Sequence, residues 1–312
     1  MSIEFDSQSQ IKVLAYITAY EDNSAVKSCI DALRNQSFPL DKIFIIDNSQ
    51  SKLISIANNE NLIIQRYPEN IGISGGLVIA FEFAIKHNYD FIWTFDQDSL
   101  PEVDCLKKLL KIYNEKLKDG YSVGIIAPTS IDIRTNEVIT GAIFVNDHFT
   151  GCNHINGDYP YECDAPITSG SLISIATAKK NPLPRTDLFI DGIDMDYGLQ
   201  LKQNGYHNLI VPQAILIHQF GNPVKVNFFN KERFFQKYSA LRHYYICRNH
   251  TYLATRYAKG WYQITSFGRR IKYLIHHVIL ILLHESEQKV LKIWACLKGT
   301  FDGFIGRLGK NW

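Results

Sequence analysis

The sequence predicts an α/β fold with a mostly parallel sheet flanked by helices, followed by a helical C-terminal region. Three observations carry this prediction. Apolar runs of strand length alternate with stretches of helical spacing. Polar residues follow several of the expected strands directly. The 312 residues are 46% hydrophobic and 21% charged, which is ordinary for a globular protein with a sizeable core.

The first half of the chain alternates strands and helices. Residues 11–19 read as a buried strand, and the next helix places Val26, Ile30 and Leu33 on one face, with Asn23 or Ser24 as its cap. A glycine-rich loop at 70–76 is expected to run into a helix that ends near residue 86. Further strands are expected at 42–46, 62–66, 91–95 and 122–127, and a helix at 102–118.

The second half is less regular. Residues 136–166 suggest hairpin-like pieces, and an acidic stretch near residue 191 leads into a helix that Asn204 and Gly205 close. A strand is expected at 208–217, and helices at 231–258, 264–284 and 286–308. We therefore expect an α/β domain over 1–230 and a helical region over 231–312.

Charge is distributed unevenly between these two parts. Residues 1–230 carry 18 Lys and Arg against 27 Asp and Glu, whereas residues 231–312 carry 15 against 4. The basic region suits an anionic partner. Its charges alternate with aliphatic runs, so we expect no nucleic-acid partner. Two alternatives remain for the helix at 264–284: it lies in a membrane interface, or it is an ordinary helix of a C-terminal subdomain or homodimer contact.

The cysteines and the N-terminus predict a cytoplasmic location, peripheral to the inner face of the cell membrane if the interfacial alternative holds. No C-x-x-C pair or zinc-spaced cluster occurs among the six cysteines, so we expect reduced thiols. The first ten residues are polar and indicate no signal peptide. No run reaches the roughly 18 apolar residues of a membrane span.

Polar side chains converge on one edge of the predicted sheet. Tyr20, Asp47, Asn70, Asp96 and Asp98 all follow expected strands. In an open α/β sheet this carboxyl edge is where ligands bind. An Asp-x-Asp pair there supplies the oxygen ligands that Mg²⁺ or Mn²⁺ needs while also holding a diphosphate.

A second acidic group begins a helix about a hundred residues later. Asp191, Asp194 and Asp196 stand near its N-terminus, where the helix dipole favours negative charge. Capping explains one of the three acids comfortably and all three less well. One of them is a candidate general base, which deprotonates an acceptor hydroxyl, while the metal pair neutralises a leaving diphosphate.

The order of these motifs resembles the inverting glycosyltransferases of family 2, which have the Rossmann-like GT-A fold, and more narrowly the bacterial rhamnosyltransferases. The resemblance spans most of the chain. It is carried by the segments 18–20, 46–49, 70–76, 94–99, 168–171, 189–206, 218–221 and 244–249.

The resemblance implies roles for individual residues. Asp98 is the direct metal ligand, Asp96 holds metal or the donor ribose, and His218 lies near the metal or diphosphate. Asp194 acts as general base, and Asp196 flanks it. Asp191 remains the alternative base, because Ile193 stands where many family members have an acid. The remaining implied donor-binding residues are Tyr20, Asp47, Asn70, Gly72, Gly75, Gly76, Gln97, Ser169 and Arg248.

These roles imply a metal-dependent transfer of a sugar, L-rhamnose from dTDP-rhamnose, to a lipid-diphosphate-linked cell-surface glycan such as an O-antigen, capsule or cell-wall polysaccharide. The alternatives are another donor in the same fold, such as UDP-galactofuranose, UDP-glucose or UDP-N-acetylglucosamine, or a non-catalytic polysaccharide-assembly protein.

Overall fold

The computed structural model describes residues 11–155, 157–219, 221, 223–228 and 231–312. The signal-peptide prediction concerned residues 1–10, which lie outside this part. The chain forms two compact units. Unit 1 comprises Met1–Ile143, Gly151–Arg185 and Asp194–Gln219, and unit 2 comprises Phe144–Thr150, Thr186–Ile193 and Phe220–Trp312. The basic helical region therefore belongs to a unit that also takes up two short earlier segments, and the division falls eleven residues before the predicted boundary.

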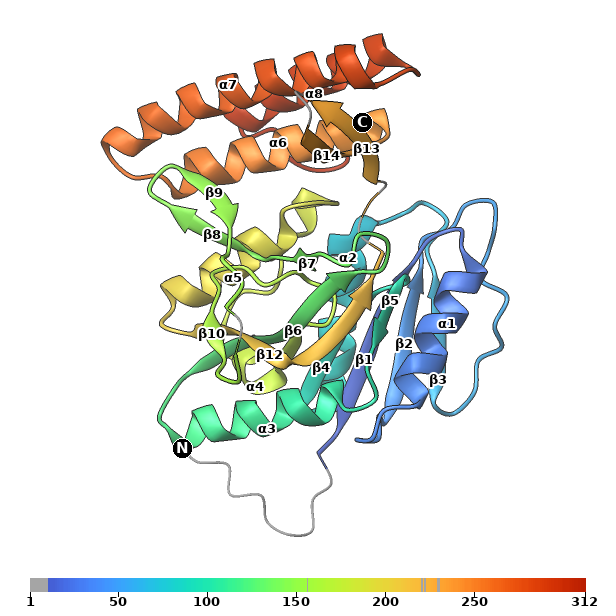
Figure 1. The fold of residues 1–312 in the computed structure, drawn as a ribbon. Helices are drawn as coiled ribbons and strands as arrows, with labels where there is room; N and C mark the ends of the chain where they lie inside the picture. The colour runs from blue at the N-terminus through green and yellow to red at the C-terminus, as the bar shows by residue number, and fades with distance from the viewer. Residues whose placement is uncertain (1–10, 156, 220, 222, 229–230) are drawn as a thin grey trace. The chain divides into compact units, whose positions relative to one another are not determined.

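Unit 1 is built on a mixed, mostly parallel sheet (Figure 1). Its parallel half contains β1 (Val13–Ala19), β2 (Lys42–Asp47), β3 (Leu62–Arg66) and β4 (Phe91–Asp96). The register pairs Ala19 with Asp47 and Thr18 with Asp96. The carboxyl ends of these strands therefore meet at one edge, as the sequence predicted.

The other half of the sheet brings a late strand back to this edge. β12 (His207–His218) runs parallel to β6 (Val123–Asp132), and β11 (Leu172–Ser174) lies antiparallel between β6 and β4. The short strands β5 (Ser99–Pro101), β7 (Val138–Ile139) and β10 (Tyr161–Glu162) pair antiparallel at its margins. A separate hairpin joins β8 (Ala142–Val145) to β9 (His148–Gly151).

Helices cover both faces of the parallel half because its strands are apolar on both sides. Alternate residues of β1 share the main core with α1 (Asn23–Arg34) and α3 (Cys105–Lys118). α2 (Gly72–Lys86) packs on the opposite face, where Phe83 stacks on Phe44 of β2. The shorter helices of the chain are α4 (Ile175–Lys180), η1 (Thr186–Leu188) and α5 (Ile193–Gln203).

The structure corrects several local predictions. The cap of α1 is Asp22, whose Oδ1 accepts the backbone N–H groups of Ser24 and Ala25 at 3.0 Å. The predicted loop at 70–76 is helical from Gly72. The single helix predicted over 231–258 is wrong at its start, because β14 (Lys231–Gln236) pairs with β13 (Pro223–Phe228) and the helix begins at Ala240.

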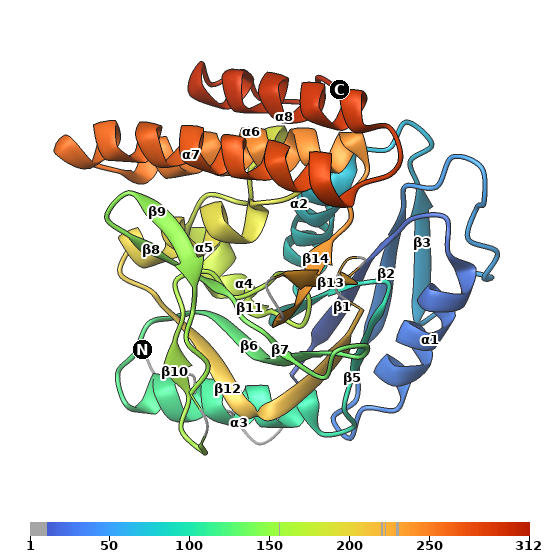
Figure 2. The ribbon, with the colours of Figure 1, turned by 45° about the horizontal axis from the view of Figure 1, so that its top comes forward.

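Unit 2 contains three long helices that lie side by side in both ribbon views (Figures 1 and 2). They are α6 (Ala240–Tyr257), α7 (Trp261–His284) and α8 (Lys289–Phe304). α8 approaches α6 closely at two glycines, since a Cβ on Gly299 or Gly303 would lie 2.4 Å from the carbonyl oxygens of Tyr244 and Arg248 respectively.

Neither a membrane span nor a disulfide is found in the described residues. Among them, no helix combines the length and the apolar character needed to cross a bilayer. All six cysteines are buried free thiols, which agrees with the predicted reduced state.

Candidate active site

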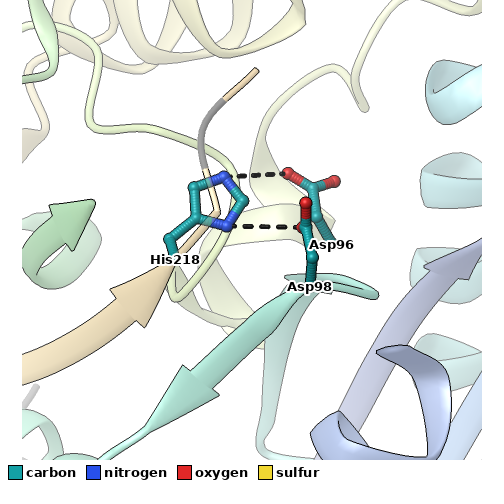
Figure 3. A group of neighbouring side chains, drawn as sticks. All are labelled: Asp96, Asp98 and His218. Carbon is teal, nitrogen blue, oxygen red and sulfur yellow. Dashed lines mark ion pairs between the residues drawn. The ribbon is translucent and has the colours of Figure 1, made fainter. Parts of the chain in front are cut away.

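Two carboxylates and an imidazole meet at the carboxyl edge of the unit 1 sheet (Figure 3). Asp96 ends β4, Asp98 stands in the turn before β5, and His218 ends β12. The His218 ring lies between the two acids, with Nε2 3.9 Å from Asp96 Oδ2 and Nδ1 3.4 Å from Asp98 Oδ1. One ligand atom from each residue lies within 4.8 Å of the others. This is the predicted metal cluster, assembled from residues 120 positions apart.

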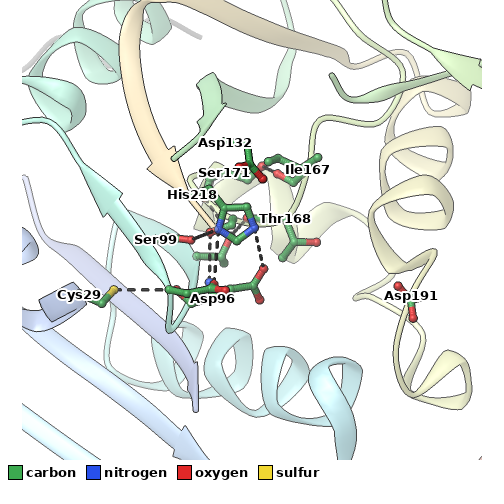
Figure 4. Close-up of polar contacts among 12 residues, drawn as sticks. Cys29, Asp96, Ser99, Asp132, Ile167, Thr168, Ser171, Asp191 and His218 are labelled. Atoms are coloured by element: carbon green, nitrogen blue, oxygen red, sulfur yellow. Dashed lines mark hydrogen bonds and ion pairs between the residues drawn. The ribbon is translucent and has the colours of Figure 1, made fainter. Parts of the chain in front are cut away.

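Two buried serines, Ser99 and Ser169, support the cluster through hydrogen bonds. Figure 4 shows Ser99 beside His218. The antiparallel pairing of β5 with β12 sets Ser99 opposite His218. Ser99 Oγ lies 2.8 Å from His218 Nδ1 and 2.6 Å from Ser169 Oγ. Ser169 Oγ also accepts the backbone N–H of Asp96 at 3.1 Å. The two hydroxyls therefore connect the imidazole to the strand that carries the first acid.

The neighbouring acid Asp132 accepts hydrogen bonds within the turn that follows β6. Asp132 pairs with His218 in the β6–β12 register and is buried. Burial alone raises the pKa of its carboxyl, but hydrogen bonds from Arg134 and Thr135 outweigh this and lower the pKa below its usual value. Asp132 thus shapes the turn after β6, and within the described residues the ligand group consists of Asp96, Asp98 and His218.

The cluster suits a divalent cation by its donor set and its access. Its two carboxylates supply oxygen ligands that Mg²⁺ and Mn²⁺ favour, and the imidazole nitrogen suits Mn²⁺ better than the harder Mg²⁺. Both acids are partly exposed, whereas His218 is buried and fixed by Ser99. Asp98 and His218 also line a pocket of about 160 Å³, together with Ala25, Ser28, Leu100, Ile133, Ile217 and Gln219.

Gln97, between the two acids, fastens the end of β1. Its side-chain Oε1 accepts the Tyr20 N–H at 2.7 Å, and its Nε2 donates to the Tyr20 carbonyl at 3.0 Å. Tyr20 itself is 47% exposed at this edge, so its ring is available for stacking. These contacts give Gln97 a positioning role and leave Tyr20 as the group facing solvent.

The predicted donor residues Asp47 and Asn70 organise loops of unit 1. Asp47 is fully buried and accepts the backbone N–H groups of Ser49 at 2.9 Å and Ile54 at 3.0 Å. Asn70 adopts a left-handed φ of 52°, and its Oδ1 accepts the Gly72 N–H at 3.0 Å. Asn48, which sequence reasoning left without a role of its own, bonds to Ile71 N and Gly72 O and so anchors this turn.

The three glycines of this segment serve different ends. Gly72 has a φ of 75°, which favours glycine at the start of α2. A Cβ on Gly76 would lie 2.5 Å from the Tyr16 hydroxyl, so this glycine lets the helix pack against the sheet. A Cβ on Gly75 would lie 3.0 Å from Ile71 Cβ. Packing therefore accounts for Gly76 without a ligand.

The three acids of the second group belong to different settings. Asp194 lies in the first turn of α5 in unit 1, is partly exposed, and its Oδ1 accepts the Met195 N–H at 2.9 Å. Asp196 is buried and its Oδ2 accepts from Gln200 Nε2 at 2.5 Å. Asp191 belongs to unit 2, where its carboxylate lies 3.2 Å from Arg242 Nη2. Burial thus disfavours Asp196 and leaves Asp191 and Asp194, both partly exposed, as candidates for the base.

Arg248 is buried in unit 2, with no exposed surface. Its guanidinium donates to the carbonyls of Asp187, Leu188 and Gly309, and its Nε donates to Asn249 Oδ1 at 2.7 Å. These contacts favour a structural role over the donor-binding role that the resemblance implied. Sequence reasoning did not predict a structural role for the neighbouring Asn249. Its Nδ2 donates to the carbonyls of Leu188, Ile190 and Asp191.

Comparison with known proteins agrees with this fold. Residues 15–160 match the family model described as glycosyl transferase family 2. The dTDP-rhamnosyl transferase RfbF of Shigella flexneri is 23% identical over 272 residues, which cover 86% of this chain and 87% of that protein.

Among solved structures, GalNAc-T7 with UDP, GalNAc and Mn²⁺ superposes with a TM-score of 0.59 at 13% identity. The match covers 95% of this chain, which spans 57% of that one. Residues 1–349 of S. aureus TarS in complex with UDP give a TM-score of 0.48 at 13% identity, covering 95% and 82% of the two chains. The chain thus has a GT-A-like fold, and its residues 15–160 are similar to glycosyl transferase family 2.

Proposed function

We propose that this protein is an inverting rhamnosyltransferase, which transfers L-rhamnose from dTDP-rhamnose to a hydroxyl group of a cell-surface polysaccharide acceptor. The cluster of Asp96, Asp98 and His218 at the carboxyl edge of a family 2 domain carries the proposal of a metal-assisted transfer. The donor rests on the similarity to the Shigella flexneri dTDP-rhamnosyl transferase.

The residues divide the work of the transfer. Tyr20 stacks against the donor base at the strand edge, and Gln97 fixes it there. Asp96, Asp98 and His218 hold the cation, which when bound supplies positive charge beside the departing diphosphate. Gly72 and Gly75, at the start of α2, let backbone approach the donor.

Asp194 handles the proton. Its carboxylate accepts the proton of the acceptor hydroxyl while that oxygen attacks the anomeric carbon. The new C–O bond forms on the face opposite the leaving oxygen, whose bond to carbon breaks, and dTDP departs with the electron pair. The configuration at the anomeric carbon is therefore inverted. The acceptor is a glycan carried on a lipid diphosphate at the inner face of the membrane.

A panel of sugar nucleotides tests the donor. The purified chain is incubated with Mn²⁺ and dTDP-rhamnose, UDP-galactofuranose, UDP-glucose or UDP-N-acetylglucosamine, and nucleotide release and thermal shift are recorded. We expect dTDP-rhamnose to give the largest response in both, and Asp98→Ala to abolish nucleotide release. A larger response to a UDP-sugar would overturn the donor assignment, and full activity of wild-type protein in excess EDTA would overturn the metal role.

A further inference from the structure

α7 carries an exposed apolar stripe along one face. Ile264, Ile271, Ile275, Ile279 and Leu282 recur at intervals of three, four or seven residues and so share that face. All are exposed except Ile271, which is partly exposed. The opposite face holds the buried residues of the helix. A helix with apolar residues on its outer face needs something to cover it.

α8 repeats this arrangement. Val290, Trp294, Leu297 and Phe301 follow one another at intervals of three or four residues, and all are exposed, Val290 by 83%. The other face of α8 packs on α6 through its glycines. The two stripes belong to helices that lie next to each other in the ribbon of Figure 2. The rings of Phe267 on α7 and Phe304 on α8 stack with their centroids 4.2 Å apart.

Charge around the stripes is positive. Residues 261–312 contain eight Lys and Arg and three Asp and Glu. Two of those acids, Glu285 and Asp302, are buried and paired with Lys292 at 2.8 Å and Lys298 at 2.9 Å. On α7 the exposed Arg269, Lys272 and His276 form a row beside the apolar stripe, and Arg269 also pairs with Asp147 at 2.8 Å.

We propose that α7 and α8 dock unit 2 on an anionic phospholipid bilayer, lying in the plane of the interface. The apolar stripes enter the boundary of the acyl chains, and the basic row contacts the headgroups. Trp261 and Tyr262, exposed at the start of α7, and Trp294 on α8 are the aromatic types enriched at such interfaces. With 24 residues, α7 extends about 36 Å along the surface.

The charge pattern favours this occupant over a second copy of the chain. In a two-fold symmetric dimer the same patch faces itself, so the basic rows would meet like charge. An anionic bilayer complements the same row, because each cation near its surface is attracted to the headgroups.

Vesicle flotation of the full chain tests the proposal. The vesicles are phosphatidylcholine alone or mixed with phosphatidylglycerol. We expect binding to the anionic vesicles, weakened by salt, and little binding to the neutral ones. Ile279→Glu combined with Trp294→Glu should lower the partition coefficient by about tenfold or more, because two apolar side chains that enter the bilayer are lost. Lys272→Glu should lower it about fivefold or more on anionic vesicles only.

Matched controls separate docking from misfolding. Val103→Glu and Lys107→Glu introduce the same charges at exposed sites of unit 1 and should bind as wild type does. Far-UV circular dichroism checks that every variant is folded. Failure of wild type to float with anionic vesicles would overturn the proposal, and so would flotation of Lys272→Glu and the double variant that equals that of wild type. The proposal would also be overturned if wild type does not bind vesicles but forms a dimer, seen by light scattering, that Ile279→Glu dissociates.

The donor panel is independent of this test. Ile279, Trp294 and Lys272 belong to unit 2, whereas Asp96, Asp98 and His218 belong to unit 1. A chain that releases nucleotide from dTDP-rhamnose without floating would sink only the docking proposal. A chain that floats without using that donor would sink only the donor assignment.

Discussion

At the scale of single residues, the histidine of the candidate metal cluster is held by a buried serine. Ser99 is fully buried, and its hydroxyl links the imidazole of His218 to Ser169. Outer partners of this kind set the orientation of a metal-binding imidazole. Ser99 is therefore a positioning residue. We expect its loss to lower metal affinity more than it lowers the stability of the fold.

Ser99→Ala should weaken Mn²⁺ binding by about 10- to 100-fold, because the ring loses the hydrogen bond that orients it. Mn²⁺ titration by isothermal calorimetry measures this without any turnover. Ser174→Ala is the matched control, since Ser174 is also buried and hydrogen-bonded but caps α4. Equal Mn²⁺ affinity in the two variants would remove the positioning role from Ser99.

Asp194→Asn should lower kcat by about 10²–10⁴-fold and leave donor affinity nearly unchanged, because only proton transfer is lost. Asp191→Asn provides the comparison, since that carboxylate already lies 3.2 Å from Arg242 Nη2. Initial rates and dTDP-rhamnose binding measured on both variants distinguish the two acids. If Asp191→Asn shows the larger fall in kcat, the base is Asp191.

Sequence reasoning reached the ligands of this site but not their supports. Asp96 and Asp98 could be predicted because a buried strand ends in two acids at a carboxyl edge. His218 could be placed at the same edge by its own strand. The link through Ser99 depends on the antiparallel pairing of a three-residue strand with β12, and so short a strand leaves no periodicity to detect.

At the scale of elements, the turn that precedes α5 is held in a strained shape by α6. Phe189 and Asp191 both adopt a φ of 65°, in the left-handed region that non-glycine residues avoid. Asn249 on α6 binds three carbonyls of this turn, those of Leu188, Ile190 and Asp191, at 2.7–2.9 Å. The Leu188 carbonyl also accepts from the Ile190 N–H at 2.8 Å and from Arg248 Nη2 at 3.0 Å, so Asn249 and Arg248 together hold the turn in this shape.

Asn249→Asp should destabilise the protein by about 2–4 kcal/mol, because a carboxylate replaces the amide donor and faces carbonyl oxygens in a buried site. Urea unfolding followed by circular dichroism measures the change. Thr255→Ala on the same helix is the control, since the Thr255 hydroxyl donates to the carbonyls of Thr251 and Tyr252 within α6. A loss of less than about 0.5 kcal/mol for Asn249→Asp would mean that the turn holds itself.

Buried histidines make the helices of unit 2 sensitive to acid. Burial, reinforced by Lys292, lowers the pKa of His243 to about 4. Burial together with His243, His276 and Arg270 lowers the pKa of His277 to about 4 as well. Between about pH 4 and 6.5 the unfolded chain therefore binds protons that the folded unit does not. Stability rises with pH across this window and falls as the pH drops through it.

We expect the free energy of unfolding to fall by up to about 1.4 kcal/mol per histidine for each pH unit between 6.5 and 4. Urea unfolding at a series of pH values measures this slope. His243→Gln should flatten it, because one of the titrating groups is removed. A slope that His243→Gln leaves unchanged would assign the acid sensitivity to other groups.

The helix boundary missed at residue 231 shows where local patterns stop being informative. Residues 231–236 pair in register with β13, from Phe228 opposite Lys231 to Pro223 opposite Gln236. A hairpin of this kind is specified by the partner strand as much as by its own sequence. The helices at α7 and α8 were predicted within a few residues of their ends, because apolar spacing over more than fifteen residues is a stronger signal.

At the scale of the whole molecule, the acidic part and the basic part of the chain carry different candidate binding sites. The acidic part of the chain carries the candidate cation ligands, and the basic part carries the exposed apolar helices. Composition predicted the two partners in kind, a cation and an anion. It left open whether the apolar residues of α7 and α8 were buried or exposed, because the same spacing serves a buried helix and an interfacial one.

Ionic strength should therefore affect two kinds of acceptor differently. For an acceptor embedded in anionic vesicles, kcat/KM should fall by about tenfold or more as NaCl rises from roughly 0.05 to 0.5 M, because salt screens the attraction between the basic row and the headgroups. For a short soluble acceptor, kcat/KM should change by no more than about twofold, since the row has no headgroups to meet. Lys272→Glu should reduce the salt dependence with vesicles and leave the soluble reaction unchanged. Equal salt dependence for both acceptors would place the effect in the candidate site of unit 1 and would remove the basic row from substrate capture.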